Sequence, residues 1–186
     1  MKSIGLNQVI LPMSEKEGAE GSTIIIHSTK FGDLDVPESS VIEFRSGLIG
    51  LPSAKRFVMF EYKAPFSWLH SVDDPSLAFV VVNGFEFGTE LNFKPPYGDK
   101  DIDLQQGDEF AILVIVTVRT DPRLTTANLK APLFVNLKNR KGTQIIFDDP
   151  RLTTRYSLWV EGDEAAVAAV SQASPADKTP PDNDKK

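Results

Sequence analysis

Two apolar runs constrain the fold of this chain more than any other part of its sequence. Residues 77–82 (LAFVVV) and 110–118 (FAILVIVTV) are apolar on both sets of alternating positions. Alternating positions of a strand point to opposite faces, so strands of this kind must be covered on both faces. A buried helix is the alternative for such a run, but the length and the density of valine and isoleucine favour strands. The chain therefore needs a stacked or tightly curved sheet.

From residue 23 onward the sequence has the alternating apolar pattern of short strands, separated by Gly, Pro, Asn and Asp. We predict an all-β, single-domain fold, a barrel-like antiparallel sheet with short loops. The expected strands are 23–28, 40–44, 56–62, 67–71, 77–82, 110–118, 133–138, 143–147 and 155–160.

Residues 131–149 (APLFVNLKNRKGTQIIFDD) are typical of a hairpin, with Asn139 and Gly142 available for the positive φ angles of a tight loop. The tip carries Lys138, Arg140 and Lys141. RNA contact is one interpretation of this basic tip. A solvated turn whose lysines discourage strand pairing is the interpretation that we favour.

The composition points to an acidic protein without disulfides. The 186 residues include 26 acidic and 20 basic side chains, for a formal charge of −6, and no cysteine. Negative charge repels phosphate backbones and attracts basic partners, so we expect a basic protein partner and no direct nucleic-acid binding. The start of the sequence lacks a signal-peptide pattern, and the apolar runs are too short to span a membrane. We therefore expect a cytoplasmic protein that does not contact the membrane.

The two ends differ in composition from the middle. We expect a flexible N-terminal extension over residues 1–21, a folded β domain over 22–162, and a flexible, disordered C-terminal tail over 163–186. The tail is rich in Pro, Asp and Lys and lacks the apolar surface that would offset its ordering entropy.

No catalytic, cofactor or metal motif is recognisable. Asp99, Asp101 and Asp103 have the spacing of a calcium loop, but Leu104 and Phe110 stand where such a loop needs glycine and glutamate. Histidine occurs only twice, and no triad, Walker or dinucleotide-binding motif is present. We therefore predict a protein that is not an enzyme and that holds neither a metal nor a cofactor.

The hexapeptide DPRLTT occurs twice, at residues 121–126 and 149–154. One pair does not make a repeat fold. Asp-Pro followed by threonines favours a turn in which the carboxylate accepts hydrogen bonds from nearby backbone N–H groups, so we expect two similar loops. A shared binding role is the alternative.

Five blocks in a fixed order carry a family resemblance that runs from about residue 29 to residue 158. They are FRSGLIGLP (44–52), FSWLHSVDDPSLAFVVVN (66–83), AILVIVTV (111–118), TANLKAPLFVNLKNRKGTQIIF (126–147) and TTRYSL (153–158). Together they closely resemble the FliW family of flagellar assembly factors.

This resemblance implies a binding function. FliW proteins bind flagellin in the cytoplasm and, when free of flagellin, bind and antagonise the translational regulator CsrA. Flagellin translation then follows flagellin secretion. We expect the two partners to exclude one another and the free protein to be a monomer.

The candidate contact residues are Asp73 and Asp74 in an acidic turn, with Trp68, Glu86 and Phe87 expected around it. Residues 44–52, with two glycines and three exposed or core-filling apolar side chains, are either a binding loop or a core-filling turn. The alternative function is a β-barrel that holds a small ligand in its mouth. A structural module of the cell envelope is disfavoured by the missing signal peptide.

Overall fold

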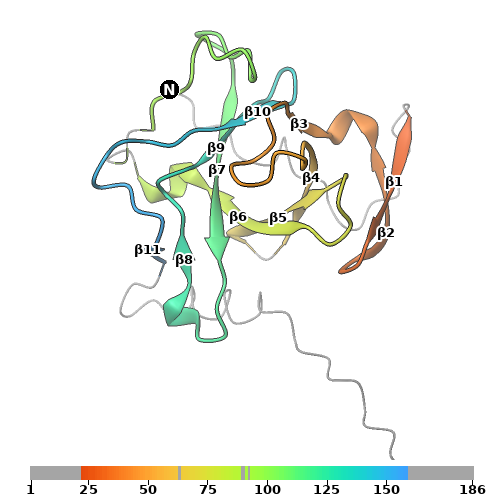
Figure 1. Cartoon of the computed structure of the whole chain (residues 1–186), viewed down its shortest axis with the longest axis horizontal. Coiled ribbons are helices and arrows are strands. Elements are labelled where there is room, and N and C mark those ends of the chain that lie inside the picture. The colour runs from red at the N-terminus through yellow and green to blue at the C-terminus, as the bar shows by residue number, and fades with distance from the viewer. Residues whose placement is uncertain (1–21, 63, 89–90, 92, 159–186) are drawn as a thin grey trace, which may run out of the picture.

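A computed structural model describes residues 22–62, 64–88, 91 and 93–158 of the chain. In this part of the chain the structure is a β-barrel of seven strands with a separate two-stranded hairpin against its side (Figure 1). The strands are β1 (Thr23–Ser28), β2 (Gly32–Pro37), β3 (Ile42–Phe44), β4 (Arg56–Glu61), β5 (Phe66–Ser71), β6 (Ala78–Asn83), β7 (Phe110–Thr117), β8 (Thr126–Ala127), β9 (Leu133–Asn136), β10 (Lys141–Gln144) and β11 (Tyr156–Ser157). Three short 3-10 turns join them: η2 (Glu38–Ser40), η3 (Gly84–Phe87) and η4 (Pro122–Leu124).

The barrel runs in the order β7-β6-β5-β4-β3-β10-β9 and closes when β9 pairs with β7. All of these pairs are antiparallel except β3 with β10, which are parallel at Lys141 opposite Glu43 and Gly142 opposite Phe44. One edge of β7 is shared: its first half pairs with β9, and its last residues pair with β8. The short strands β8 and β11 therefore extend the sheet beyond the barrel.

The inside of the barrel is filled by side chains that we call the inner cluster. Successive strands each contribute, from Phe44 on β3 and Phe57 on β4 to Leu69 on β5. The Phe44 ring packs directly against Gly142 on β10. A Cβ atom at Gly142 would lie 2.5 Å from that ring, so a larger residue would not fit there without a shift. A barrel of this size is closed by its own side chains.

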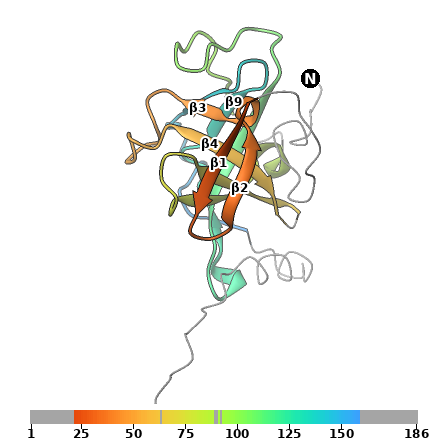
Figure 2. The same ribbon diagram turned by 90° about the vertical axis from the view of Figure 1, so that its right-hand side faces the viewer.

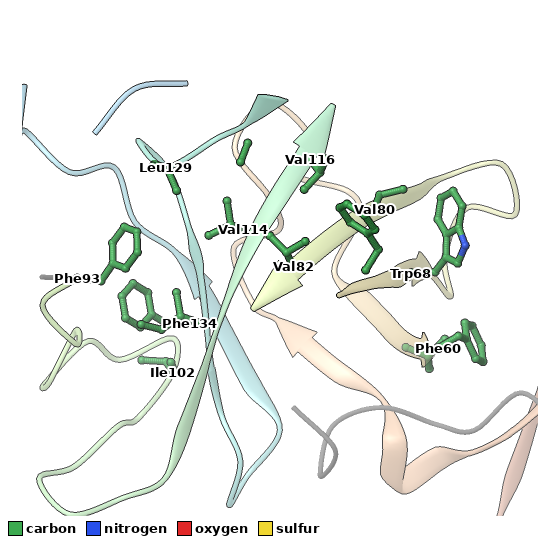
Figure 3. Close-up of a cluster of buried hydrophobic side chains, with 14 of the residues drawn as sticks. Phe60, Trp68, Val80, Val82, Phe93, Ile102, Val114, Val116, Leu129 and Phe134 are labelled. Atoms are coloured by element: carbon green, nitrogen blue, oxygen red, sulfur yellow. The ribbon is translucent and has the colours of Figure 1, made fainter. Parts of the chain in front are cut away.

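The outer faces of β4 to β7 and β9 are covered as well, by side chains that we call the outer cluster. Figure 3 shows it running from Phe93 and Phe134 at one end, past Val82 and Val114, to Phe60 and Trp68 at the other. The β1–β2 hairpin lies against the barrel (Figure 2) and buries Ile26 and Val36 in the same cluster as Trp68. Its turn is residues 29–31, and Gly32 completes it at φ 75°.

The predicted all-β barrel with two-sided cover of the apolar runs is confirmed, and the predicted strands fall on observed ones within a few residues at each end. Two strands were not predicted, β2 and β8. The pure antiparallel pairing was wrong at β3–β10. The hairpin over residues 131–149 is present as β9–β10, but the positive φ in its turn belongs to Arg140 (57°) and not to Asn139 or Gly142. Asn139 instead accepts a hydrogen bond from the backbone N–H of Lys141.

The expectations for the chain ends, 1–21 and 163–186, fall outside the described residues. The 22–162 domain boundary stays a prediction.

Candidate protein-binding surfaces

Asp73, in the turn between β5 and β6, has a structural role. Its carboxylate accepts hydrogen bonds from the backbone N–H groups of Lys55 (3.2 Å) and Arg56 (2.9 Å) and from Nε of Arg56 (2.8 Å). Burial by itself raises the pKa of Asp73, but these hydrogen bonds and the Arg56 charge outweigh it and hold the pKa below its usual value. The side chain thus fixes the start of β4 to the end of β5.

Asp74, the next residue, is oriented locally and remains exposed. Its Oδ1 accepts from the backbone N–H (2.9 Å) and the hydroxyl (2.7 Å) of Ser76, and these bonds lower its pKa. The Ser71 hydroxyl oxygen accepts from the backbone N–H groups of both Asp73 and Asp74 and so shapes the turn. Of the two acidic residues, Asp74 is the one that can offer its charge to a partner.

Trp68 lies in the middle of β5 and belongs to the outer cluster, with only 5% of its surface exposed. The edges of Phe31 and Tyr62 contact it, with ring centroids at 5.4 and 5.7 Å. Trp68, a predicted contact residue, thus lies under the β1–β2 turn, where it packs the hairpin onto the barrel.

Glu86 and Phe87 lie in η3, directly after β6. The Asn83 side chain accepts from the N–H of Phe85 and starts this turn. Phe87 meets Tyr156 of β11 edge to face at 5.6 Å. Phe85 (39% exposed) and Tyr156 (42%) lie at the surface, and Glu86 is exposed beside them. We call these four residues the aromatic patch.

The structure separates the predicted contact residues into two places. Asp73 and Asp74 precede β6, and Glu86 and Phe87 follow it. A six-residue strand spans about 20 Å, so the expectation that all of them surround the acidic turn was wrong. The aromatic patch also contains Tyr156, which sequence reasoning did not select. The position of Tyr156 depends on the pairing of β8 with β11, and the residues around Tyr156 do not predict that pairing.

The loop over residues 44–52 combines both roles that were considered for it. Leu48 is buried in the inner cluster, whereas Ile49 (54% exposed) and Leu51 are at the surface. Gly47 has a positive φ of 72°, and a Cβ there would lie 2.7 Å from Pro52 backbone atoms. The loop is thus a tight, core-anchored turn with two exposed apolar side chains.

Comparison with known proteins gives the family. The FliW protein family model matches residues 25–158. The flagellar assembly factor FliW of Caldicellulosiruptor saccharolyticus is 36% identical over 137 residues, which cover 73% of this chain and 90% of that protein. The FliW of Magnetococcus marinus is 38% identical over 128 residues, covering 67% of this chain and 79% of the relative. This chain belongs to the FliW family.

A solved FliW structure supports the same assignment at the level of the fold. The crystal structure of the flagellar assembly factor FliW superposes with a TM-score of 0.64 at 29% identity, covering 75% of this chain and 99% of that one. FliW proteins are assembly factors, and the protein is accordingly not an enzyme.

The small-ligand and metal alternatives can be compared with the described part of this FliW chain. Buried side chains of the inner cluster pack inside the barrel; a small ligand held in the barrel mouth stays an alternative that this packing does not test. Two surface hollows of about 270 Å³ are lined mainly by charged residues, one by Glu43, Arg45, Lys100, Asp101 and Lys141. Among the described residues no group of three or more acidic, histidine or cysteine side chains is placed to hold a metal. Asp99 and Asp103 are engaged within their own turn.

Within the same described ranges, no helix has the length and apolar character needed to cross a membrane.

The two DPRLTT segments form matching turns, as predicted. Asp121 accepts from the backbone N–H and the guanidinium of Arg123, and Asp149 does the same with Arg151. The hydrogen bonds from Arg151 lower the pKa of Asp149 to about 2. The leucines of the two copies differ, because Leu152 is buried in the outer cluster and Leu124 is 63% exposed. The two copies of the hexapeptide thus form two turns with the same hydrogen bonds.

Proposed function

We propose that this FliW protein acts in the cytoplasm, where it binds flagellin and, when free of flagellin, binds and antagonises CsrA. Membership of a family of flagellar assembly factors supports this proposal. The surface that carries it is the aromatic patch: three aromatic side chains and one carboxylate at one end of β6. Aromatic side chains concentrate binding energy where a partner excludes water.

The two surfaces suit the two partners by their chemistry. CsrA must be basic to hold RNA, so the exposed Asp74 turn on a protein of charge −6 would steer its approach. The ends of unassembled flagellin carry an apolar stripe that needs cover, and the aromatic patch would provide it. Asp73 and Trp68 contribute to this scheme by holding the turn and the hairpin in place.

Two charge reversals of equal size can test where the acidic surface of this protein contacts CsrA. We expect Asp74→Lys to slow association with CsrA about three- to tenfold at low salt, with a smaller effect on dissociation, because steering acts on the encounter. Glu86→Lys changes the net charge equally but at the other end of β6, so it should slow association less. Stopped-flow or surface-binding kinetics measure both. Equal slowing by the two variants would place the CsrA contact elsewhere.

Exclusion between the partners is the property that would turn two bindings into a switch. If flagellin and CsrA cannot occupy the protein together, each lowers the apparent affinity for the other by the same factor. We expect saturating flagellin to raise the apparent dissociation constant for CsrA at least about tenfold, a coupling of about 1.4 kcal/mol. Because the Asp74 turn and the aromatic patch are a strand length apart, exclusion must come from the size of the bound partners or from coupling through the barrel.

The measurement is calorimetry with CsrA titrated into this protein after loading with monomeric flagellin, and the reverse titration as the reciprocity check. A stable ternary complex with unchanged affinities would contradict the switch and leave the two separate bindings intact.

A further inference from the structure

The indole N–H of Trp68 has no hydrogen-bond acceptor. The Nε1 atom is buried, and the side chain as a whole is 5% exposed. Buried N–H groups in native proteins are almost always paired, since an unpaired one loses its bonds to water without replacement. An acceptor from outside the described residues would therefore gain a hydrogen bond here that no described residue provides.

A second donor without a counter-ion lies next to it. Lys30, in the turn between β1 and β2, holds its ammonium 3.7 Å from the centroid of the Trp68 ring. Burial lowers the pKa of Lys30. Among the described residues the Lys30 ammonium makes no ion pair, and its contacts are the faces of Trp68 and Phe31. The Lys30 ammonium is thus partly desolvated, and no described carboxylate pairs with it.

The indole ring and the backbone that carries Lys30 are each held in place. Phe31 and Tyr62 both contact the indole edge to face, and the backbone N–H groups of Lys30 and Phe31 both donate to the Ser28 hydroxyl oxygen (3.2 and 3.1 Å). Figure 3 shows Trp68 at one end of the outer cluster, and Phe31 of the hairpin turn packs on it. Lys30 itself is an exposed residue of the hairpin turn, so its ammonium is open to a ligand from solvent.

We infer that Trp68 and Lys30 form a binding site for a carboxylate of a partner polypeptide, either an acidic side chain or a C-terminus. A carboxylate has acceptor positions for both donors at once, and charge-assisted hydrogen bonds in a partly dry site are the stronger kind. A peptide carbonyl would satisfy the indole N–H and leave the cation uncompensated. This site stands on its own geometry, so it holds or fails independently of the partners proposed above.

Three short peptides test the site by the NMR signal of the Trp68 indole N–H. The protein has two tryptophans, so the Trp159→Phe variant leaves Trp68 as the only indole reporter. The probes are acetyl-Ala-Glu-Ala-amide, acetyl-Ala-Gln-Ala-amide and acetyl-Ala-Ala-Ala with a free C-terminus. We expect the two carboxylate peptides to shift the signal saturably with dissociation constants of about 1–10 mM, the range of a single small contact. The tighter of the two identifies the source of the carboxylate.

Variants at Lys30 supply the control for charge. Lys30→Met keeps the stem over the indole and removes the cation, so it should weaken the carboxylate peptides at least about fivefold. Lys30→Arg should retain most of the binding. The inference is overturned if neither carboxylate peptide gives a saturable shift, if the glutamine peptide matches the glutamate peptide, or if Lys30→Met binds as tightly as the unaltered residue.

Discussion

Replacing Gly142 by alanine is expected to lower the free energy of unfolding by about 2–3 kcal/mol, the upper part of the range for overpacking a core. The new Cβ would lie 2.5 Å from Cε1 and 2.7 Å from Cζ of Phe44, whose ring is fully buried in the inner cluster. The ring cannot simply turn aside, because it meets Phe57 edge to face at 5.6 Å within a closed barrel. Chemical denaturation measures the loss.

A second substitution shows whether the Phe44 ring is the cause. Phe44→Leu removes the two ring atoms nearest to the new methyl group. The double variant should therefore lose less free energy of unfolding than the two single variants lose together, by about 1 kcal/mol or more. Thr143→Ala on the same strand is the matched control and should cost much less. Additive losses in the double variant would show that Gly142 is needed for a reason other than the Phe44 contact.

Gly142 also illustrates what the sequence could and could not reveal. A glycine in a hairpin predicts backbone freedom, which is a local property. Its actual role depends on the parallel pairing of β10 with β3, whose partners are about a hundred positions apart in the chain. The strands with strong alternation or continuous apolar runs were predicted because their burial pattern is visible in the few consecutive residues of each strand. The pairing that closes the barrel was not, because it is decided by packing across the whole domain.

The same distinction applies to the candidate contacts. Asp73 has the appearance of a free acidic residue in the sequence, yet its partners are Lys55 and Arg56 on a neighbouring strand. The cover over Trp68 was not predicted, because β2 (GDLDVP), with two aspartates, a glycine and a proline, lacks a strand pattern. Without β2 there is no hairpin to cover the indole. Asp74, Glu86 and Phe87 were assigned surface roles from their type, and they do lie in exposed or half-exposed turns.

The hairpin that covers Trp68 is fastened to the barrel by one buried polar network. His70 on β5 is fully buried, with Nδ1 at 2.6 Å from the carbonyl oxygen of Ser71 and Nε2 at 2.7 Å from the hydroxyl of Ser28 on β1. A carbonyl only accepts, so Nδ1 carries a proton, and in the neutral ring Nε2 then accepts from the Ser28 hydroxyl. The Ser28 oxygen in turn accepts from the two backbone N–H groups of the turn.

We therefore expect Ser28→Ala to cost about 2–3 kcal/mol, because it leaves the buried His70 Nε2 and two N–H groups without their partner. The loss should be local. Native-state hydrogen exchange should show faster opening of β1 and β2 with little change in β7, since β1 and β2 pair only with each other, and apart from packing and this network the hairpin turn meets the barrel through hydrogen bonds from Thr29 to the Pro75 carbonyl. Thr29→Ala, which removes only a long, exposed hydrogen bond to the Pro75 carbonyl, is the matched control. Uniform loss of protection across β1 and β7 would mean that the hairpin and the barrel unfold as one unit. In that case the cover over Trp68 could not move without the rest of the fold.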